Sequence, residues 1–359
     1  MTADLRELSG LTLDELTRFV TEELGEQGYR ARQIFRWIHQ RGATSFDQMT
    51  NLSKPLRQRL GEVATMRSLV KDLEQRSTDG TIKYRFRTAD DRRIETVYMP
   101  AEDRRTLCVS TQAGCAMGCT FCMTATMGLQ RNLTPAEIVG QVHAVNFEIA
   151  GQNPTATQRP ITNLVFMGMG EPLHNFENLK TSLQILRSEE GLNFSHRHIT
   201  VSTVGLVPMI ERFGQETDVK LAISLNASHD AQRSEIMPIN RKWNIATLLE
   251  ACRKFPLRQG RRITFEYVLM KGINDVDDDA RRLVELLKGI PAKVNLIPYN
   301  ENPGLGFESS GEVRADEFRQ ILANGHVAAF VRKNRGRDIA AACGQLANVT
   351  SLTTPLTGT

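Results

Sequence analysis

Three closely spaced cysteines are the residues of this sequence best suited to chemistry. Cys115, Cys119 and Cys122 form a C-x3-C-x2-C pattern, and Phe121 precedes the last of them. Iron–sulfur clusters are held by cysteine thiolates, and a [4Fe–4S] cluster normally takes four of them. Three cysteines hold three irons and leave the fourth open to a small molecule. We therefore expect a single [4Fe–4S] cluster bound by Cys115, Cys119 and Cys122.

Two plainer interpretations of this motif compete with the cluster. A zinc site takes four nitrogen or sulfur ligands, usually from paired Cys or His sets, and no histidine lies within the motif. Buried structural thiols are the other alternative, but they rarely cluster around two glycines. The amino and carboxylate groups of S-adenosylmethionine (SAM) suit an iron with an open position. The spacing also resembles the signature of the radical SAM superfamily.

Composition places the chain in a broad class without naming its activity. The 359 residues are 40% hydrophobic and 24% charged, an ordinary balance for a globular protein. No apolar run approaches the ~20 residues that span a bilayer, and the first residues do not resemble a signal peptide. We therefore expect a cytoplasmic protein without a membrane partner and without stable disulfides. The net charge of +4 is compatible with RNA binding but does not establish it.

The beginning of the chain reads as a helical module. Residues 11–24 have apolar side chains at helical spacing, and Thr12 with Glu15 makes a capping-box pattern. A second helix is expected over 29–41, and one or two short helices over 45–60. The second helix carries several arginines and no acid. It either follows an RNA backbone or belongs to a small bundle with solvated charges, and the sequence leaves both open.

After Thr81 the pattern changes to alternation. Two alternating runs flank residues 89–91, which is typical of a β-hairpin. Glu95 lies in the second run, where an acid normally faces solvent. We expect the chain to divide into a helical accessory domain (1–75), a hairpin linker (76–105), a catalytic domain (106–346) and a tail (347–359).

Strands and helices alternate through the catalytic domain. We expect strands over 106–110, 161–167, 198–202, 219–225, 262–269 and 293–297, with helices between them. Such alternation predicts an α/β fold with a parallel sheet. Six strands match the partial (β/α)6 barrel of radical SAM enzymes. Chemistry in such barrels collects at the carboxyl ends of the strands.

Polar residues and glycines follow the ends of these strands. After the second strand, Gly170 allows close approach of a ligand to the backbone, and Glu171 can accept a hydrogen bond from an ammonium group. We expect these residues to bind SAM together with others at the ends of the later strands: Ser202, Ser224, Leu225, Asn226 and Asn300. Each of these polar residues, taken alone, is more often an ordinary group at the end of a strand. The glycine turn, taken alone, is weak support for a SAM site.

The last part of the chain combines basic residues with a further cysteine. Four of the six residues 332–337 are basic, which makes this segment a candidate for binding phosphate. Cys343 follows three alanines and precedes a glycine. On residue type alone it is a small buried hydrophobic residue.

Several motifs outside the cluster resemble one known family. They are residues 108–110 ahead of the cluster, 168–172 after the second strand, 295–300, and 341–346 around Cys343. Together these motifs resemble the RlmN family of RNA adenine C2-methyltransferases over nearly the whole length. The related Cfr family methylates C8 of the same adenine, but residues 170–172, 296–298 and 335–336 look more like RlmN. Asn226 and Ala340 depart from the pattern, where the family often has His and Asp.

The resemblance implies a specific chemistry. Cys343 takes a methyl group from one SAM, and the cluster cleaves a second SAM to give the radical that activates this methyl group. The methylene radical adds to C2 of adenine, and Glu95 takes the C2 proton. Cys108 then attacks Cys343, which frees the RNA and leaves a transient Cys108–Cys343 disulfide. A flavodoxin-like electron donor and a thiol reductant are implied.

The resemblance also implies the substrates. They are an adenine of the peptidyl-transferase centre in 23S rRNA and, for many members, adenine 37 of tRNA. Because the adenine must leave its stack, an exposed RNA loop is the expected target. Two alternatives remain open at this point: methylation of C8, and an iron–sulfur protein that binds RNA without catalysis.

Overall fold

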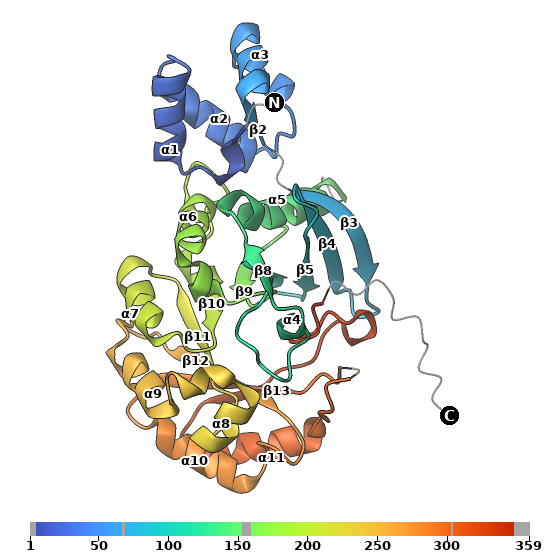
Figure 1. The fold of residues 1–359 in the computed structure, drawn as a ribbon, viewed down its shortest axis with the longest axis vertical. Coiled ribbons are helices and arrows are strands. Elements are labelled where there is room, and N and C mark those ends of the chain that lie inside the picture. Colours follow the sequence, from blue (N-terminus) through green and yellow to red (C-terminus); the bar gives the residue numbers. More distant parts are fainter. Residues whose placement is uncertain (1–4, 67–68, 153–158, 303, 348–359) are drawn as a thin grey trace.

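A large, mostly parallel sheet forms the framework of the protein. The structure is a computed structural model that describes residues 5–66, 69–152, 159–302 and 304–347. The parallel strands are β6 (Arg105–Cys108), β9 (Asn163–Phe166), β10 (Ile199–Thr203), β11 (Lys220–Ser224), β12 (Ile263–Leu269), β13 (Ala292–Pro298) and β14 (Ala329–Val331). The predicted α/β fold is confirmed (Figure 1).

Three antiparallel strands extend this sheet to ten strands. They are β3 (Leu69–Arg76), β4 (Ile82–Thr88) and β5 (Arg93–Pro100), and β5 joins β6 antiparallel. The expected hairpin is therefore present, but it belongs to the main sheet instead of forming a linker. The boundary expected at residue 75 falls inside β3. The charged residues of β3 hid the strand from pattern reading, because its half-buried residues, such as Leu73, Glu74 and Gln75, do not alternate with exposed ones.

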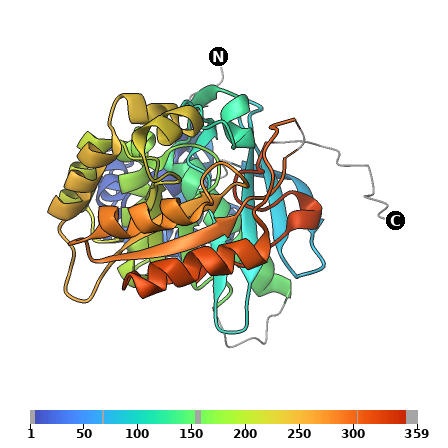
Figure 2. The same cartoon turned by 90° about the horizontal axis from the view of Figure 1, so that it is seen from below.

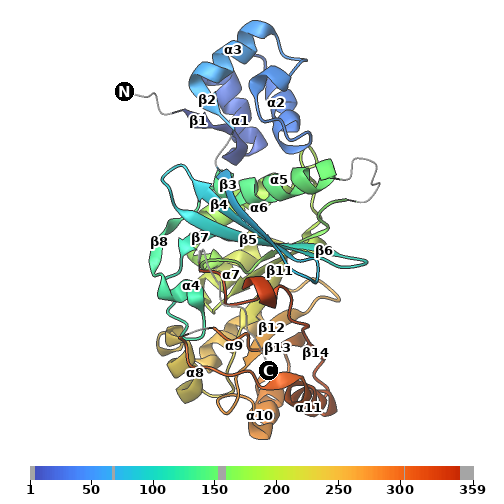
Figure 3. The same cartoon turned by 90° about the vertical axis from the view of Figure 1, so that its right-hand side faces the viewer.

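The N-terminal module packs on one end of the sheet domain. Its helices are α1 (Leu13–Arg18), α2 (Tyr29–His39) and α3 (Lys54–Val63), and two short parallel strands, β1 (Arg6–Glu7) and β2 (Ala64–Thr65), close it. The predicted capping box is present, since Thr12 Oγ1 accepts from the Glu15 N–H and Glu15 accepts from the Thr12 N–H. Figure 3 shows this module above the sheet domain.

Helices cover one face of the parallel strands. They are α5 (Pro135–Gln152), α6 (Phe176–Arg187), α7 (Val207–Glu216), α9 (Ile245–Lys254), α10 (Asp277–Leu287) and α11 (Gly311–Asn324). The residues beneath them, such as Leu164, Phe265 and Leu296, are fully buried. Figure 2 shows α10 and α11 side by side at the far end of the molecule from the N-terminal module.

The opposite face of the parallel strands carries the polar residues, and we call it the inner face. Side chains alternate between the faces of a strand, so the buried apolar positions place their neighbours on the inner face. These include Cys108, Ser202, Ser224, Glu266 and Asn295. The fold thus places the polar strand residues on one surface.

Short elements complete the chain around this surface. They are β7 (Gln112–Gly114), α4 (Met123–Thr126), β8 (Leu129–Asn132) and α8 (Asp230–Ile236), with 3₁₀ turns at Leu8–Gly10, Phe46–Gln48, Pro172–Asn175, His196–His198, Pro238–Arg241 and Arg337–Ile339 and a π turn at Phe19–Glu23. No helix in the described ranges is long and apolar enough to cross a membrane.

The C-terminal segment returns from β14 to the turn between β3 and β4. The Asp338 carboxylate accepts hydrogen bonds from the Ser77 hydroxyl at 2.6 Å and from the Thr78 N–H at 3.1 Å. The Gly336 N–H donates to the Asp79 carboxylate at 3.0 Å. These contacts hold the C-terminal segment, red in Figure 3, next to the main sheet. Nearly all of the predicted tail, 348–359, lies outside the described residues.

Candidate active site

The three motif cysteines lie in a loop that the β7–β8 hairpin closes. Gly114 ends β7 with a φ of +76°, and a Cβ there would lie 1.8 Å from the carbonyl oxygen of Gly128. The Cys115 N–H donates to the same carbonyl at 3.0 Å. Only glycine permits this approach. The loop that holds Cys115 is therefore set by a contact between two backbones.

The motif thiols lie within electrostatic reach of one another. Cys119 is buried and Cys115 is half-buried, and both are free thiols. Burial raises the pKa of Cys115 to about 12, and the neighbouring Cys122 adds to the effect. Burial likewise raises the pKa of Cys119, reinforced by the other two cysteines. Bound iron would remove this cost, because a metal holds its thiolate ligands deprotonated.

The chemistry of the donor set fits an iron–sulfur cluster, because such clusters are held by cysteine thiolates. Within the described ranges, no three His, Cys, Asp or Glu side chains converge closely enough to hold one metal ion. The assignment of a cluster to Cys115, Cys119 and Cys122 stays a prediction.

The glycine turn after β9 packs tightly against the strands before the cluster. A Cβ on Gly170 would lie 2.5 Å from Cβ of Gln112, and one on Gly168 would lie 2.6 Å from Oγ of Ser110. The φ of Gly170 is +96°. Packing against Ser110 and against β7 thus requires both glycines. This supports the plainer interpretation of the motif, namely a tight turn that needs glycine for steric reasons.

Glu171 follows this turn with its carboxylate buried near the cluster loop. Its two oxygens accept hydrogen bonds from the Leu173 N–H at 3.0 Å and the Val204 N–H at 2.9 Å. Burial raises its pKa to about 7. The carboxylate is close enough to raise the pKa values of Cys115 and Cys119. An ammonium group in the expected contact would therefore share the Glu171 oxygens with these two backbone N–H groups.

The residues expected at the ends of the next two strands lie together. The Oγ atoms of Ser202 on β10 and Ser224 on β11 are 3.5 Å apart. Leu225 is fully buried, and its N–H donates to the Glu266 carbonyl at 3.0 Å. The two serines share the inner face, whereas the Leu225 side chain belongs to the core. Any contact of Leu225 with SAM would use its backbone.

Asn226 has a structural task at the end of β11. Its φ is +56°, in the left-handed region that Asn tolerates better than most residues. Its Oδ1 accepts from the Val268 N–H at 2.9 Å, and its carbonyl accepts from the Asn274 side chain at 2.7 Å. A His, which the family resemblance suggests at this position, has a ring nitrogen that can also accept a hydrogen bond.

Asn300, after β13, has an unsatisfied polar atom. The residue is 2% exposed, and its Oδ1 has no hydrogen-bond partner among the described residues. Its neighbours contact the cluster loop, because Tyr299 packs with Cys119 and Phe121. A buried carbonyl without a partner costs free energy, so a bound molecule with a donor group would fit here.

Arg233 is a site residue that sequence reasoning missed. It is fully buried, and its guanidinium donates to the carbonyls of Val204 at 2.7 Å and Leu225 at 3.0 Å. It also donates to the carbonyl of Ser224 at 3.2 Å. Burial lowers its pKa to about 10. Arg233 thus ties together the ends of two strands, but in sequence it looks like any arginine of a surface helix.

Cys343 is an exposed residue beside the cluster loop. The carbonyl of Gly344 accepts from the Met123 N–H at 2.8 Å, and the carbonyl of Leu346 accepts from the Thr124 hydroxyl at 2.6 Å. The surrounding protein raises the pKa of the Cys343 thiol to about 11. The structure therefore corrects the plainer expectation of a buried hydrophobic cysteine, since the residue is exposed.

Cys108 lies on the inner face near Cys343. It is 8% exposed, and burial raises its pKa well above that of an ordinary thiol. The negative charge of a Cys343 thiolate raises it further, which places the two sulfurs within electrostatic reach. Both thiols are free in the structure. Residues separated by more than two hundred positions thus lie near one another.

Glu95 is buried, although an acid in such a strand is normally solvated. It is 1% exposed, and its Oε1 lies 3.5 Å from Nζ of Lys83. The Ala347 N–H donates to its Oε2 at 3.0 Å. The Ser110 hydroxyl donates to the backbone carbonyl of Glu95 and not to its carboxylate. The expectation that an acid here faces solvent is wrong, because β5 is covered by the C-terminal segment.

Comparison with known proteins agrees with this geometry. Residues 6–66 match the family model "Ribosomal RNA large subunit methyltransferase N-terminal domain", and 109–287 match "Radical SAM superfamily". "Dual-specificity RNA methyltransferase RlmN 2" of Myxococcus xanthus is 75% identical over 346 residues, or 96% of this chain and 92% of that protein. The chain belongs to the RlmN family.

Other RlmN relatives and a solved structure support the same assignment. "Dual-specificity RNA methyltransferase RlmN" of Anaeromyxobacter dehalogenans is 58% identical, covering 96% of this chain and 92% of its own length. The crystal structure of a radical SAM methyltransferase from Sphaerobacter thermophilus is 47% identical, with a TM-score of 0.90, covering 95% of this chain and 99% of that one. The predicted RlmN resemblance and radical SAM fold are confirmed. Membership of the radical SAM superfamily implies an iron–sulfur cluster and SAM.

Proposed function

We propose that this protein methylates C2 of an adenine in RNA, with 23S rRNA and tRNA as its substrates. The observation that carries the proposal is the convergence of three groups of cysteines. Gly344 and Leu346, next to the exposed Cys343, are hydrogen-bonded to the helix after the cluster motif. The buried Cys108 lies within electrostatic reach of Cys343. The names of the RlmN relatives support an RNA methyltransferase.

The cofactors of this proposal are one [4Fe–4S] cluster and SAM. Cys115, Cys119 and Cys122 would hold the cluster. SAM would bind at the carboxyl ends of the strands, through Gly170, Glu171, Ser202, Ser224, Leu225, Asn226 and Asn300. The unsatisfied Oδ1 of Asn300 is the feature that fits a bound ligand most directly. When bound, the cluster and two SAM molecules per turnover supply one-electron chemistry and the methyl group.

Cys343 is proposed to carry the methyl group between SAM and RNA. C2 of adenine lies between two ring nitrogens and is too electron-poor to attack a methyl group itself. A thiolate accepts the methyl group as a nucleophile, and Cys343, as an exposed residue, can then present it to RNA. Arg332 lies within electrostatic reach and favours the thiolate form of Cys343, opposing the effect of burial on its pKa.

Glu95 and Cys108 are proposed to complete the reaction on the carbon–sulfur adduct. Glu95 takes the proton from C2, and the bound cluster would accept the one electron that the adduct radical must also lose. Oε1 of Glu95 has no hydrogen-bond partner among the described residues. The Cys108 sulfur then attacks the Cys343 sulfur. The new S–S bond forms as the C–S bond to the RNA breaks, and the electron pair stays on carbon, which takes up a proton. An external thiol then reduces the disulfide.

The test is to find which carbon of adenine is methylated. Protein reconstituted under anaerobic reduction is incubated with methyl-labelled SAM and with tRNA or 23S rRNA, and the nucleosides are separated by mass spectrometry. We expect 2-methyladenosine, and none from a Cys343→Ser variant. 8-Methyladenosine would indicate Cfr-like chemistry instead. RNA binding without SAM cleavage would indicate a non-catalytic iron–sulfur protein.

A further inference from the structure

Within the described residues, the inner face below Cys343 carries cations that have no carboxylate within 4.0 Å. Lys220 begins β11 and Lys293 lies near the start of β13, while Arg262 directly precedes β12 and Arg332 directly follows β14. Side chains alternate along each strand, and the strand register places these four residues on the same face as Ser224 and Asn295. The inner face therefore has a line of basic residues running away from Cys343.

These four cations differ from the basic residues on the outer helices. None of the four has a carboxylate within 4.0 Å in the described part of the chain. On the outer helices, by contrast, Arg281 and Arg319 pair with acids one turn away. The acid that lies among the four inner-face cations, Glu266, accepts a hydrogen bond from the Asn295 side chain at 2.9 Å. The inner face thus keeps an excess of positive charge.

The four cations lie close enough to affect one another. Burial lowers the pKa of Lys293, and the charges of Arg332 and Arg262 lower it further, against the opposing effect of Glu266. Burial also lowers the pKa of Lys220, and the positive charge of Lys293 lowers it further. Holding like charges together costs free energy. A polyanion bound along this face would remove that cost.

An exposed aromatic ring lies among these cations. Phe330, in the middle of the edge strand β14, is 55% exposed. Its register partner is Asn295, so its side chain shares the inner face, while Ala329 and Val331 are in register with the buried Val294 and Leu296. Aromatic rings beside basic residues are the usual platform for unpaired bases.

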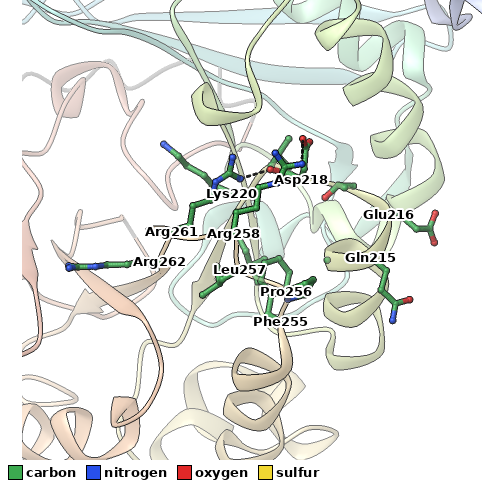
Figure 4. Close-up of a pocket in the computed structure, with 14 residues that line it drawn as sticks. Gln215, Glu216, Asp218, Lys220, Phe255, Pro256, Leu257, Arg258, Arg261 and Arg262 are labelled. Carbon is green, nitrogen blue, oxygen red and sulfur yellow. Dashed lines mark hydrogen bonds and ion pairs between the residues drawn. The ribbon is translucent and has the colours of Figure 1, made fainter.

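Lys220 and Arg262, at one end of this line of basic residues, also line a pocket of about 440 Å³. Arg258 donates to the Asp218 carboxylate at 3.0 Å, and Arg261 donates to the Asp218 carbonyl. Figure 4 shows these contacts and shows Arg262 extending away from them. Asp218 thus occupies Arg258 and Arg261 but leaves Lys220 and Arg262 available. The pocket holds none of the predicted site residues.

We propose that the inner face binds the single-stranded RNA that flanks the target adenine. One base stacks on Phe330, and the adjoining phosphates contact Arg332, Lys293, Lys220 and Arg262. This inference rests on the proposed function for the identity of its ligand. The inference describes where the RNA runs beyond the reacting base. This path is ~20 Å long, the length of about seven strand residues. Arg332 connects this path to the reaction, since its charge also acts on Cys343.

The test measures binding of a tRNA transcript by fluorescence anisotropy over a range of salt concentrations. We expect Phe330→Ala to weaken binding about 5- to 100-fold with an unchanged salt slope, and Phe330→Trp to restore affinity. We expect the double variant Lys220→Gln/Arg262→Gln to lower the slope of log K against log salt by about 1.4, or about 0.7 per lost contact with single-stranded RNA.

Matched controls come from residues on the outer helices. Val313, which is 77% exposed on α11, provides Val313→Ala as the control for Phe330→Ala. The double variant Lys254→Gln/Lys288→Gln removes the same charge from positions paired with acids on their own helices. Both controls should bind the transcript as the wild type does. A duplex RNA of the same length should compete weakly with the transcript.

The outcomes separate this inference from the proposed function. Unchanged affinity and salt slope in the Phe330 and Lys220/Arg262 variants, with normal methylation by the wild type, would overturn the inference and leave the function intact. The expected losses in a protein that binds RNA but does not methylate it would support the surface and remove the function. Equal losses in the outer-helix controls would also overturn the inference.

Discussion

Nζ of Lys83 lies 3.5 Å from Oε1 of Glu95, and the two side chains are only 6% and 1% exposed. The residues lie on neighbouring antiparallel strands, β4 and β5. Nζ of Lys83 also donates to the Ala340 carbonyl at 3.3 Å. Burial lowers the pKa of Lys83, and the negative charge of Glu95 opposes this effect. One buried ion pair therefore connects the proposed base to the segment that carries Cys343.

Replacing Lys83 by Met should destabilise the protein by about 3 kcal/mol, because Glu95 would remain buried without a counter-charge. The measurement is urea unfolding of the single variant, of Glu95→Gln and of the double variant. We expect the double variant to lose less than the sum of the two single variants. Strict additivity would show that the two side chains do not interact.

Replacing Cys108 by Ala should trap the enzyme on its substrate. Without the resolving thiol, the carbon–sulfur bond between Cys343 and RNA stays intact. After one turnover, denaturing electrophoresis should show a protein–RNA adduct that survives boiling. Cys252→Ala is the matched control, since Cys252 is 1% exposed in the helix-covered core. Free methylated RNA from Cys108→Ala would remove the resolving role from Cys108.

Replacing Gly114 by Ala should prevent cluster assembly. The new Cβ would lie 1.8 Å from a backbone oxygen of Gly128, which cannot move without displacing the loop of Cys115. Gly128→Ala is the control, because it has a similar φ of +63° but nothing within 4 Å of its Cβ. Iron and sulfide analysis after anaerobic reconstitution should show near-zero loading for Gly114→Ala. Gly128→Ala should lose at most the ~1–2 kcal/mol of left-handed strain and still load.

Stability should fall as the pH drops below about 6.5, because two histidines, the buried His39 of α2 and the half-buried His143 of α5, lie against each other. Nδ1 of His39 lies 3.2 Å from Nε2 of His143. Burial lowers the pKa of His143 to about 4 and that of His39 well below its usual value. Below pH 6.5 the unfolded chain binds protons that the folded protein does not, so each histidine costs about 1.4 kcal/mol per pH unit.

The measurement for this pair is the urea midpoint between pH 7 and pH 5. His143→Gln should flatten the pH dependence, and the exposed His326, at the end of α11, supplies the control His326→Gln. We expect the control to follow the wild type. A wild-type midpoint that is constant over this range would show that the pair does not bind fewer protons in the folded state.

The features that sequence analysis predicted well are those with local causes. The capping box of Thr12 with Glu15 joins residues three positions apart. The parallel strands were predictable because burial on one face imposes alternation. The cysteine motif needs no more than eight residues to define its spacing. Each of these depends on neighbours along the chain.

The features that only the tertiary structure decided depend on distant segments. Glu95 is buried because Ala347 and Lys83 cover it, and Arg233 matters because strand ends meet its guanidinium. The strand β3 escaped prediction because its partner strand, and not its own pattern, holds it in the sheet.

The sequence by itself determined the reactive residue types, the cluster motif and the order of strands and helices. The tertiary structure decided which thiols lie within electrostatic reach of one another, which acid is buried, and which cations of the described residues lack a carboxylate partner. The physical reason is that propensity and periodicity act over a few residues. Burial and electrostatic interactions act through space, between residues that the sequence leaves far apart.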